Sequence, residues 1–151
     1  MVQKIVRAAA IIIREGKILL ALSKYGNDSF YLCPGGVVEE YETIREAAQR
    51  EIKEETNCDV RIEELLYVRE WINKKEAANV LDVFFRGKFI RGKETHLFDP
   101  CLAKGVIKKL EWVPISELQT VDFEPKMLVS HLQNDFPKDF EGRTIYIGAS
   151  P

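Results

Sequence analysis

The chain has 151 residues, of which 46% are hydrophobic and 30% charged, a composition typical of a globular protein and not of a disordered one. Its net charge is −2 and its lysines and arginines are scattered, which argues against binding to a nucleic-acid polymer. The longest apolar runs, such as residues 8–13, are too short to cross a membrane, and the N-terminus lacks signal-peptide features, so we expect a cytoplasmic protein. The three cysteines include no Cys-x-x-Cys pair, which disfavours a structural zinc site or a disulfide framework.

The first part of the chain has the pattern of short strands joined by turns. Three strands are predicted, over residues 4–13, 17–23 and 30–33. Glu15-Gly16 is typical of a tight turn between the first two strands, and residues 25–29 have the composition of a loop. We expect the third strand to end at residues 34–36, Pro-Gly-Gly, where the backbone must bend sharply.

A helix is predicted over residues 43–56, which contain no Gly or Pro, and Asn57 is suited to the left-handed residue that ends a helix. The patterns beyond it predict strands over 60–72, 79–90, 109–113 and 143–147, a loop over 92–105, a short helical turn at 117–118 and a second helix over 124–134. Pro125 would occupy a favourable early position in that second helix. Because the chain shows no repeat and no linker, we expect a single α+β domain over residues 1–151.

The first helix places carboxylates where its pattern predicts apolar contacts. At about 100° of rotation per residue, one arc holds the apolar residues Ile44, Ala47, Ala48 and Ile52. Glu51 and Glu55 fall within that arc and Glu54 at its edge, while Arg50 points more toward solvent. Three like charges on one face require a cation, and a hard divalent ion such as Mg²⁺ suits clustered carboxylate oxygens. The alternative is an acidic, solvent-facing helix with Glu46–Arg50 and Arg50–Glu54 ion pairs.

The loop before this helix favours the metal hypothesis. The Pro-Gly-Gly segment at 34–36 lets the backbone approach other groups closely, and a glycine carbonyl can supply a further oxygen ligand. Glu39, Glu40 and Glu42 add carboxylates near the helix start. For Glu39 and Glu40, a favourable interaction with the helix dipole explains their position equally well.

Residues 36–58 resemble the Nudix box. That pattern is Gly, five residues, Glu, seven residues, and then Arg-Glu-apolar-x-Glu-Glu-x-Gly-apolar. This chain matches every charged position and both spacings, through Gly36, Glu42 and the run from Arg50 to Cys58. Only the penultimate Gly differs, and Asn57 can adopt the same positive-φ conformation with a slight loss of stability. The N-terminal hairpin and residues 110–118 extend the similarity to Nudix (MutT-like) hydrolases over most of the chain.

The resemblance implies a fold of the α/β (α+β) class, an α/β/α sandwich with a mixed β-sheet held between helices. It also implies a Mg²⁺-dependent reaction, with Mn²⁺ as an alternative ion, in which water cleaves a pyrophosphate bond of a nucleoside di- or triphosphate derivative. By similarity, the metal ligands would be Gly36, Glu51, Glu54 and Glu55, and the catalytic residues Glu51, Glu54 and Arg50. Glu51 or a carboxylate from a later loop would take the proton from water. Arg50 and Glu42 would orient Glu51 or hold the loop against the helix, the alternative being an ordinary surface ion pair.

Residues outside the box offer further candidates. Arg7 and Lys24 are candidates to bind substrate phosphates, although cations at strand ends are usually only solvated. The sequence does not choose among three possible additional carboxylates, Glu94, Asp99 and Glu111. Three aromatic residues are suited either to the core or to stacking on a base, Trp71, Phe84 and Trp112.

The expected partner is a nucleotide-like small molecule, with no nucleic-acid polymer and no membrane, and strand edges make a homodimer conceivable. ADP-ribose hydrolases typically carry a Pro a short way beyond the box, where this chain has Lys74 and Lys75. One class of dinucleoside polyphosphate hydrolases carries a Tyr in that region, where Glu76 stands. One alternative function is a non-catalytic nucleotide-binding sensor of the same fold. Another is an isoprenoid diphosphate isomerase, which would require a paired cysteine and glutamate, for example with Cys33.

Overall fold

The computed structural model describes residues 1–93 and 106–150. Eight strands in this part of the chain form one sheet: β1 (Gln3–Arg14), β2 (Lys17–Tyr25), β3 (Asp28–Leu32), β4 (Gly35–Val37), β5 (Asp59–Asn73), β6 (Ala78–Arg91), β7 (Val106–Pro114) and β8 (Ile145–Ser150). The helical segments there are α1 (Ile44–Thr56), the 3-10 helix η1 (Ile115–Thr120), α2 (Met127–Asp135) and the 3-10 helix η2 (Phe136–Lys138). None of these helices is long and apolar enough to cross a membrane.

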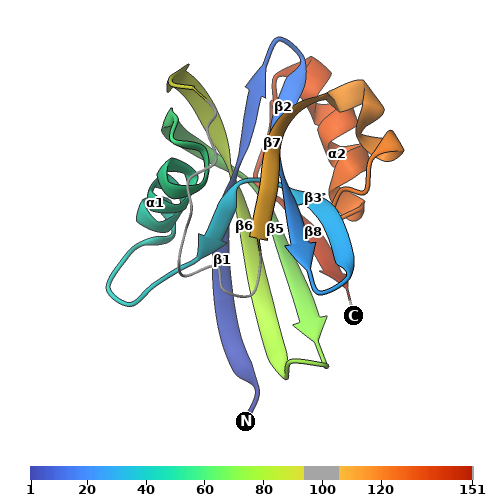
Figure 1. Ribbon diagram of the computed structural model, residues 1–151. Coiled ribbons are helices and arrows are strands. Elements are labelled where there is room, and N and C mark those ends of the chain that lie inside the picture. Colours follow the sequence, from blue (N-terminus) through green and yellow to red (C-terminus); the bar gives the residue numbers. More distant parts are fainter. Residues whose placement is uncertain (94–105, 151) are drawn as a thin grey trace.

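The sheet is mixed, and its main strand order is β3-β2-β1-β6-β5-β8. β1 pairs in parallel with β6, and β5 in parallel with β8, whereas the other strand pairs are antiparallel. β1 and β2 pair only beside their turn, where Ile13 faces Ile18 and Arg14 faces Lys17. Beyond that point β1 pairs with β4 while β2 pairs with β3 and β7, so the two strands of the hairpin separate (Figure 1).

Helices lie on both faces of the sheet (Figure 1). On one face, α1 packs in a core that includes Ala8, Ala10 and Ile12 of β1. On the other face, α2 and η1 pack in a second core that includes Ala9 and Ile11. Because successive side chains of a strand point to opposite faces, β1 contributes to both cores. The predicted α/β/α sandwich with a mixed sheet is therefore confirmed.

Most element boundaries agree with the predictions, but the structure corrects several of them. Residues 35–37 form β4, where the sequence predicts only a bend, because they pair with β1. β2 and β3 extend into the predicted loop at 25–29, so only residues 26–27 lie between them. The strand predicted over 143–147 is β8, Ile145–Ser150, whose limits are set by its pairing with β5. The loop predicted over 92–105 lies almost wholly outside the described residues.

The second helix also begins later than predicted. α2 starts at Met127, and Pro125 precedes it after a cis Glu124–Pro125 peptide bond. The chain before this proline is held against β3, because the backbone N–H of Tyr31 donates to Asp122 O at 2.7 Å and that of Glu124 donates to Tyr31 O at 2.9 Å. These contacts keep the chain out of helical conformation at residue 124. A single domain over residues 1–151 stays a prediction.

Candidate active site

The helix α1 is fixed at both ends by capping interactions. At its start, the Thr43 hydroxyl accepts from the backbone N–H of Glu46, and the Glu46 carboxylate accepts from that of Thr43. At its end, Asn57 adopts the predicted left-handed conformation with φ 59°, and its backbone N–H donates to Lys53 O. These caps satisfy backbone groups that would otherwise lack helical partners. The caps thus fix where the helix begins and ends, and its buried residues Ala47, Ala48 and Ile52 set the rotation that directs its carboxylates.

Two carboxylates of α1 are buried with its apolar face. Glu51 is 8% and Glu55 5% exposed, beside Ala48 and Ile52, which are fully buried. The prediction that these glutamates face inward is confirmed, and the alternative of a wholly solvent-facing acidic helix is wrong. Ile44, predicted on the same apolar arc, is instead 36% exposed because it lies in the first turn, before the buried stretch begins.

The strand β4 brings its two glycines against these carboxylates. β4 pairs with β1 so that Ala8 faces Gly36 and Ala9 faces Gly35. The backbone N–H of Gly35 donates to Glu55 Oε2 at 3.0 Å. A Cβ atom placed on Gly36 would lie 2.5 Å from Glu51 Oε2 and closer still to its carboxyl carbon. Glycine at this position is therefore what allows the Glu51 carboxylate to lie directly against the backbone.

Arg50 lies over the site instead of pointing away into solvent. Its Nη2 donates to Glu42 Oε1 at 2.8 Å and its Nε to Glu42 Oε2 at 3.1 Å. Its Nη1 lies 2.8 Å from Glu51 Oε1 and 3.4 Å from Glu54 Oε2, and Nη2 also donates to Val37 O at 3.2 Å. The helical phase predicts only that the Cβ atom of Arg50 points toward solvent. The long side chain turns back from there to reach Glu42 and Glu51. Hydrogen bonds from Arg50 also hold the pKa of Glu42 below its usual value.

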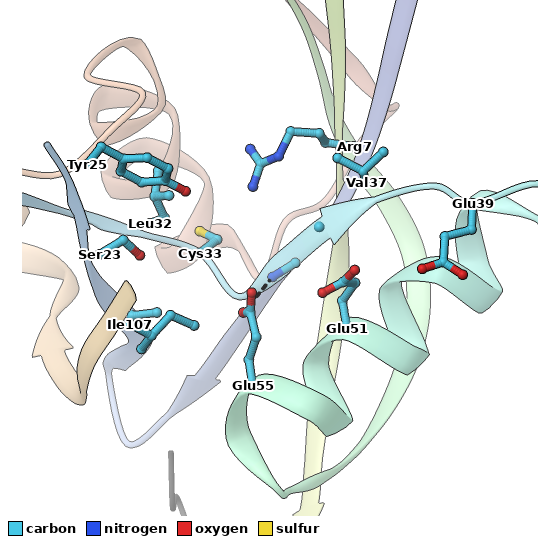
Figure 2. A pocket seen from close by; sticks show the side chains of 13 residues that line it. Arg7, Ser23, Tyr25, Leu32, Cys33, Val37, Glu39, Glu51, Glu55 and Ile107 are labelled. Atoms are coloured by element: carbon cyan, nitrogen blue, oxygen red, sulfur yellow. Dashed lines mark hydrogen bonds between the residues drawn. The ribbon is translucent and has the colours of Figure 1, made fainter. Parts of the chain in front are cut away.

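A cavity of about 360 Å³ opens between the separated strands β1 and β2 and the helix α1. Figure 2 shows Glu51 and Glu55 rising from the helix and Arg7 lying across the cavity from them, on the side of Tyr25. The lining residues come from six elements and the segments next to them: Arg7, Ala21, Ser23, Tyr25, Leu32, Cys33, Gly35, Gly36, Val37, Glu39, Glu51, Glu55 and Ile107. The arrangement opposes two buried carboxylates to one guanidinium, which suits an anion that is bound together with a cation.

The two predicted phosphate-binding residues, Arg7 and Lys24, differ in their position relative to the cavity. Arg7 lines the cavity, whereas Lys24 does not. Ser23 and Tyr25, the neighbours of Lys24 in β2, both line it, so the alternation of a strand turns Lys24 toward the opposite face. The predicted role therefore stays open for Arg7, and the structure does not bring Lys24 to the site.

Sequence reasoning missed several residues of the cavity. Tyr25 stacks on Phe30, with ring centroids 5.2 Å apart and an interplanar angle of 11°, and so forms an aromatic wall. The alternation of β2 places Ser23 on the same face as Tyr25. The sequence does not reveal this shared face, because residue 25 is predicted to lie in a loop. Cys33, which the sequence suggests only for the isomerase alternative, also lines the cavity; it is 5% exposed, and burial raises its pKa to about 12.

The other candidates that the structure describes do not line the cavity. Glu111 accepts hydrogen bonds from Tyr31 Oη and from Lys109 Nζ, and it pairs with Leu20, whose side chain belongs to the core on the α2 face. The two remaining candidate carboxylates, Glu94 and Asp99, lie outside the described residues. Among the aromatic candidates, Phe84 is a core residue at 4% exposure, Trp112 packs edge-on against Phe89, and Trp71 lies beside Arg69.

The donor set of the cavity fits a hard divalent cation. Among residues 1–93 and 106–150, no group of three His, Cys, Asp or Glu side chains converges closely enough to form a metal site. Glu51 and Glu55 face the cavity beside the backbone of Gly36, while the Glu54 side chain is 42% exposed next to Arg50. Two buried carboxylates and a neighbouring carbonyl are oxygen donors of the kind that Mg²⁺ and Mn²⁺ prefer.

Comparisons with known proteins agree with the observed fold. A solved structure of a NUDIX hydrolase from Nitrosomonas europaea matches with a TM-score of 0.75 and 24% identity, covering 91% of this chain and 90% of that one. A MutT NUDIX hydrolase from Burkholderia pseudomallei matches with a TM-score of 0.64 and 25% identity, covering 77% and 87%. An ADP-ribose pyrophosphatase of Methanocaldococcus jannaschii is 37% identical over 100 residues, which are 59% of this chain and 58% of that protein.

The match to the family model is broader than the box alone. The NUDIX domain model covers residues 4–132, from β1 through the first turns of α2. It therefore includes Arg7, the β4 glycines and the whole of α1, and it confirms the resemblance found in the sequence. The chain belongs to the NUDIX domain family.

Proposed function

We propose that the protein is a Mg²⁺-dependent pyrophosphohydrolase acting on a nucleoside di- or triphosphate derivative, with Mn²⁺ as an alternative ion. The observation that carries this proposal is the cavity in which two buried carboxylates, Glu51 and Glu55, face the guanidinium of Arg7. A diphosphate bound there would offer oxygen atoms both to a cation held by the carboxylates and to the arginine. A nucleotide-like small molecule fits this arrangement better than a polymer, because the cavity holds only about 360 Å³.

The residues of α1 would divide the chemistry between them. The proposed metal ligands are Glu51, Glu55, Glu54 and the carbonyl of Gly36. A divalent ion in this site supplies charge neutralisation of the phosphate and a lowered pKa of the attacking water. Glu51, or a carboxylate from a later loop, would accept the proton of that water. Arg50 would hold the Glu51 carboxylate in place through its 2.8 Å contact, while its bonds to Glu42 fix the arginine itself.

Within the proposed class of nucleoside di- and triphosphate derivatives, a nucleoside diphosphate linked to a further group is one candidate substrate. The similarity to a protein named ADP-ribose pyrophosphatase supports a diphosphate that joins a nucleoside to a sugar. Against a strict assignment, Lys74 and Lys75 stand where such hydrolases typically carry a Pro. Tyr25 offers a flat aromatic surface at the cavity wall against which a base or a sugar would pack.

The test is the release of phosphate, pyrophosphate or a nucleoside monophosphate from a panel of nucleotides, with and without Mg²⁺. Glu51→Gln is compared with the matched control Glu117→Gln, which alters an exposed glutamate in η1. We expect metal-dependent turnover that falls by about 10²–10⁴-fold in Glu51→Gln and is unchanged in the control. Circular dichroism and thermal unfolding check that both variants fold.

A different outcome would favour the alternative of a nucleotide sensor. Calorimetry that shows tight binding of one nucleotide, together with no turnover of any, would replace the hydrolase by the sensor. Turnover by Glu51→Gln at nearly the wild-type rate would contradict the role assigned to Glu51. Cys33 lines the same cavity, so the isomerase alternative is tested separately, by incubating the protein with an isoprenoid diphosphate.

A further inference from the structure

Three charged side chains lie side by side across the central strands next to the cavity. Arg7 in β1 faces Asp82 in β6, and Asp82 faces Arg69 in β5. Arg7 Nη1 donates to Asp82 Oδ1 at 3.3 Å, and Arg69 Nη1 donates to Asp82 Oδ2 at 3.2 Å. The side chains of Asp82 and Arg69 are 4% and 12% exposed, and that of Arg7 is 26% exposed. One buried carboxylate is therefore shared by two arginines.

Apolar rows flank this charged row on the same face of the sheet. The row on one side consists of Ala9, Phe84 and Tyr67, all of which belong to the core beneath α2. The row on the other side consists of Ile5, Val80 and Trp71. Replacing a buried ionic network by apolar residues is often neutral or stabilising. The stability of the sheet alone therefore gives no reason for charges in this row.

Arg7 is the member of the row that reaches the cavity. Its bond to Asp82 uses Nη1, and among residues 1–93 and 106–150 its Nη2 and Nε donate to no protein acceptor. Figure 2 shows its guanidinium directed into the cavity, opposite the carboxylates of α1. A guanidinium is planar and rigid, so anchoring one of its nitrogen atoms fixes the direction of the others.

We infer that Asp82 is a positioning residue, which holds Arg7 so that its remaining N–H groups bind a phosphate oxygen of the substrate, while Arg69 fixes Asp82 from the opposite side. The inference rests on the proposed function, since it assumes a phosphate-containing substrate in this cavity. Two arginines and one carboxylate leave the row with one net positive charge, which an anion entering the cavity would balance. The phosphate held by Arg7 need not react, so this contact is expected in the ground state and the transition state alike.

The test is a double-mutant cycle with Arg7→Gln and Asp82→Asn, using the nucleotide that wild-type protein hydrolyses. Each single variant should raise KM about tenfold, the effect of losing a charged hydrogen bond, and change kcat by less than about threefold. The double variant should have the KM of Arg7→Gln alone, because Asp82 acts only through Arg7. Dissociation constants for ADP, measured by calorimetry, should rise in parallel.

A second variant covers the event that Asp82→Asn alone fails to fold with two uncompensated arginines. Arg69→Gln combined with Asp82→Asn removes one charge of each sign and leaves Arg7 in place without its anchor; it should also raise KM about tenfold. The matched control is Asp59→Asn, since Asp59 likewise lies between two cations, Lys53 and Arg91, but does not line the cavity. Its KM should equal that of wild-type protein.

The outcomes separate this inference from the proposed function. Active wild-type protein with an unchanged KM in folded Asp82 variants would overturn the inference and leave the hydrolase intact. Additive effects of Arg7→Gln and Asp82→Asn would also overturn it, because Asp82 would then act independently of Arg7. A wild-type protein that neither hydrolyses nor binds any nucleotide would overturn both.

Discussion

A methyl group at Gly36 should inactivate the site without unfolding the protein. In Gly36→Ala the new Cβ would meet the end of the Glu51 side chain, 2.5 Å from Oε2, whereas ordinary contacts begin at 3.4 Å. The carboxylate must therefore retreat by about 1 Å. A displacement of that size in a catalytic group can cost about 10²-fold in rate. We expect kcat to fall by about 10²-fold, because the side chain can move while the backbone of Gly36, which has no positive φ, accepts alanine.

Gly35→Ala provides the contrast within the same strand. A Cβ at Gly35 would meet the backbone of Ala8 and Ala9 in β1, which cannot move aside as a side chain can. We therefore expect Gly35→Ala to lower the free energy of unfolding by at least about 1–3 kcal/mol. Gly36→Ala should lower it by less than about 1 kcal/mol. Both substitutions add one methyl group. At Gly35 it clashes with the backbone of β1, and at Gly36 it clashes with the carboxylate of Glu51.

The assay combines steady-state kinetics at saturating Mg²⁺ with urea unfolding of both variants. Loss of activity in Gly36→Ala with an unchanged unfolding midpoint would agree with displacement of Glu51. Near-wild-type kcat in a folded Gly36→Ala variant would refute the reasoning, because the Glu51 carboxylate would then tolerate a shift of about 1 Å. A large loss of stability in Gly36→Ala would refute it as well, since the clash would have moved the backbone.

Two further predictions concern stability. Tyr67→Phe should lower the free energy of unfolding by about 1 kcal/mol, measured by urea titration, because the buried Tyr67 hydroxyl donates to Asp135 Oδ2; an unchanged midpoint would contradict this. Hydrogen bonds from Lys53 and Arg91 lower the pKa of Asp59 from 3.8 to about 2, so its carboxylate stabilises the fold above about pH 4 and ceases to do so as the pH falls through about 2. The Tm of Asp59→Asn should thus lie below that of wild-type protein near neutral pH and converge with it near pH 2; a constant difference would contradict the assigned pKa.

The parts of the site that depend on local periodicity could be predicted from the sequence. The inward direction of Glu51 and Glu55 follows from the phase of one helix, and Asn57 follows from the conformation that ends it. Both features involve residues within a single segment. Strand pairing, in contrast, involves distant segments, which is why β4 was not predicted. β4 forms by pairing with the part of β1 from which β2 has separated.

The errors in the cavity have a similar origin. Lys24 reads as a strand-end cation, but whether it reaches a ligand depends on which face of β2 the cavity adjoins. The sequence predicts Tyr25 in a loop and its stacking partner Phe30 at the start of a strand. The short turn at residues 26–27 instead brings their rings together. Arg50 shows the limit of helical phase, because its long side chain reaches groups that its Cβ does not face.

The pairing of β1 with β4 has a consequence for how this architecture can change over time. Arg7 faces Val37 in that pairing, and Ala8 faces Gly36, the residue against which the Glu51 carboxylate of α1 lies, so paired strands connect the cationic half of the cavity to the backbone that contacts its acidic half. The register between Arg7 and Gly36 is therefore a property of two paired strands. Turns such as residues 26–27 or 74–77 can therefore gain, lose or exchange residues, and so acquire new ligand preferences, while the placement of Arg7 beside the β4 glycines is inherited unaltered.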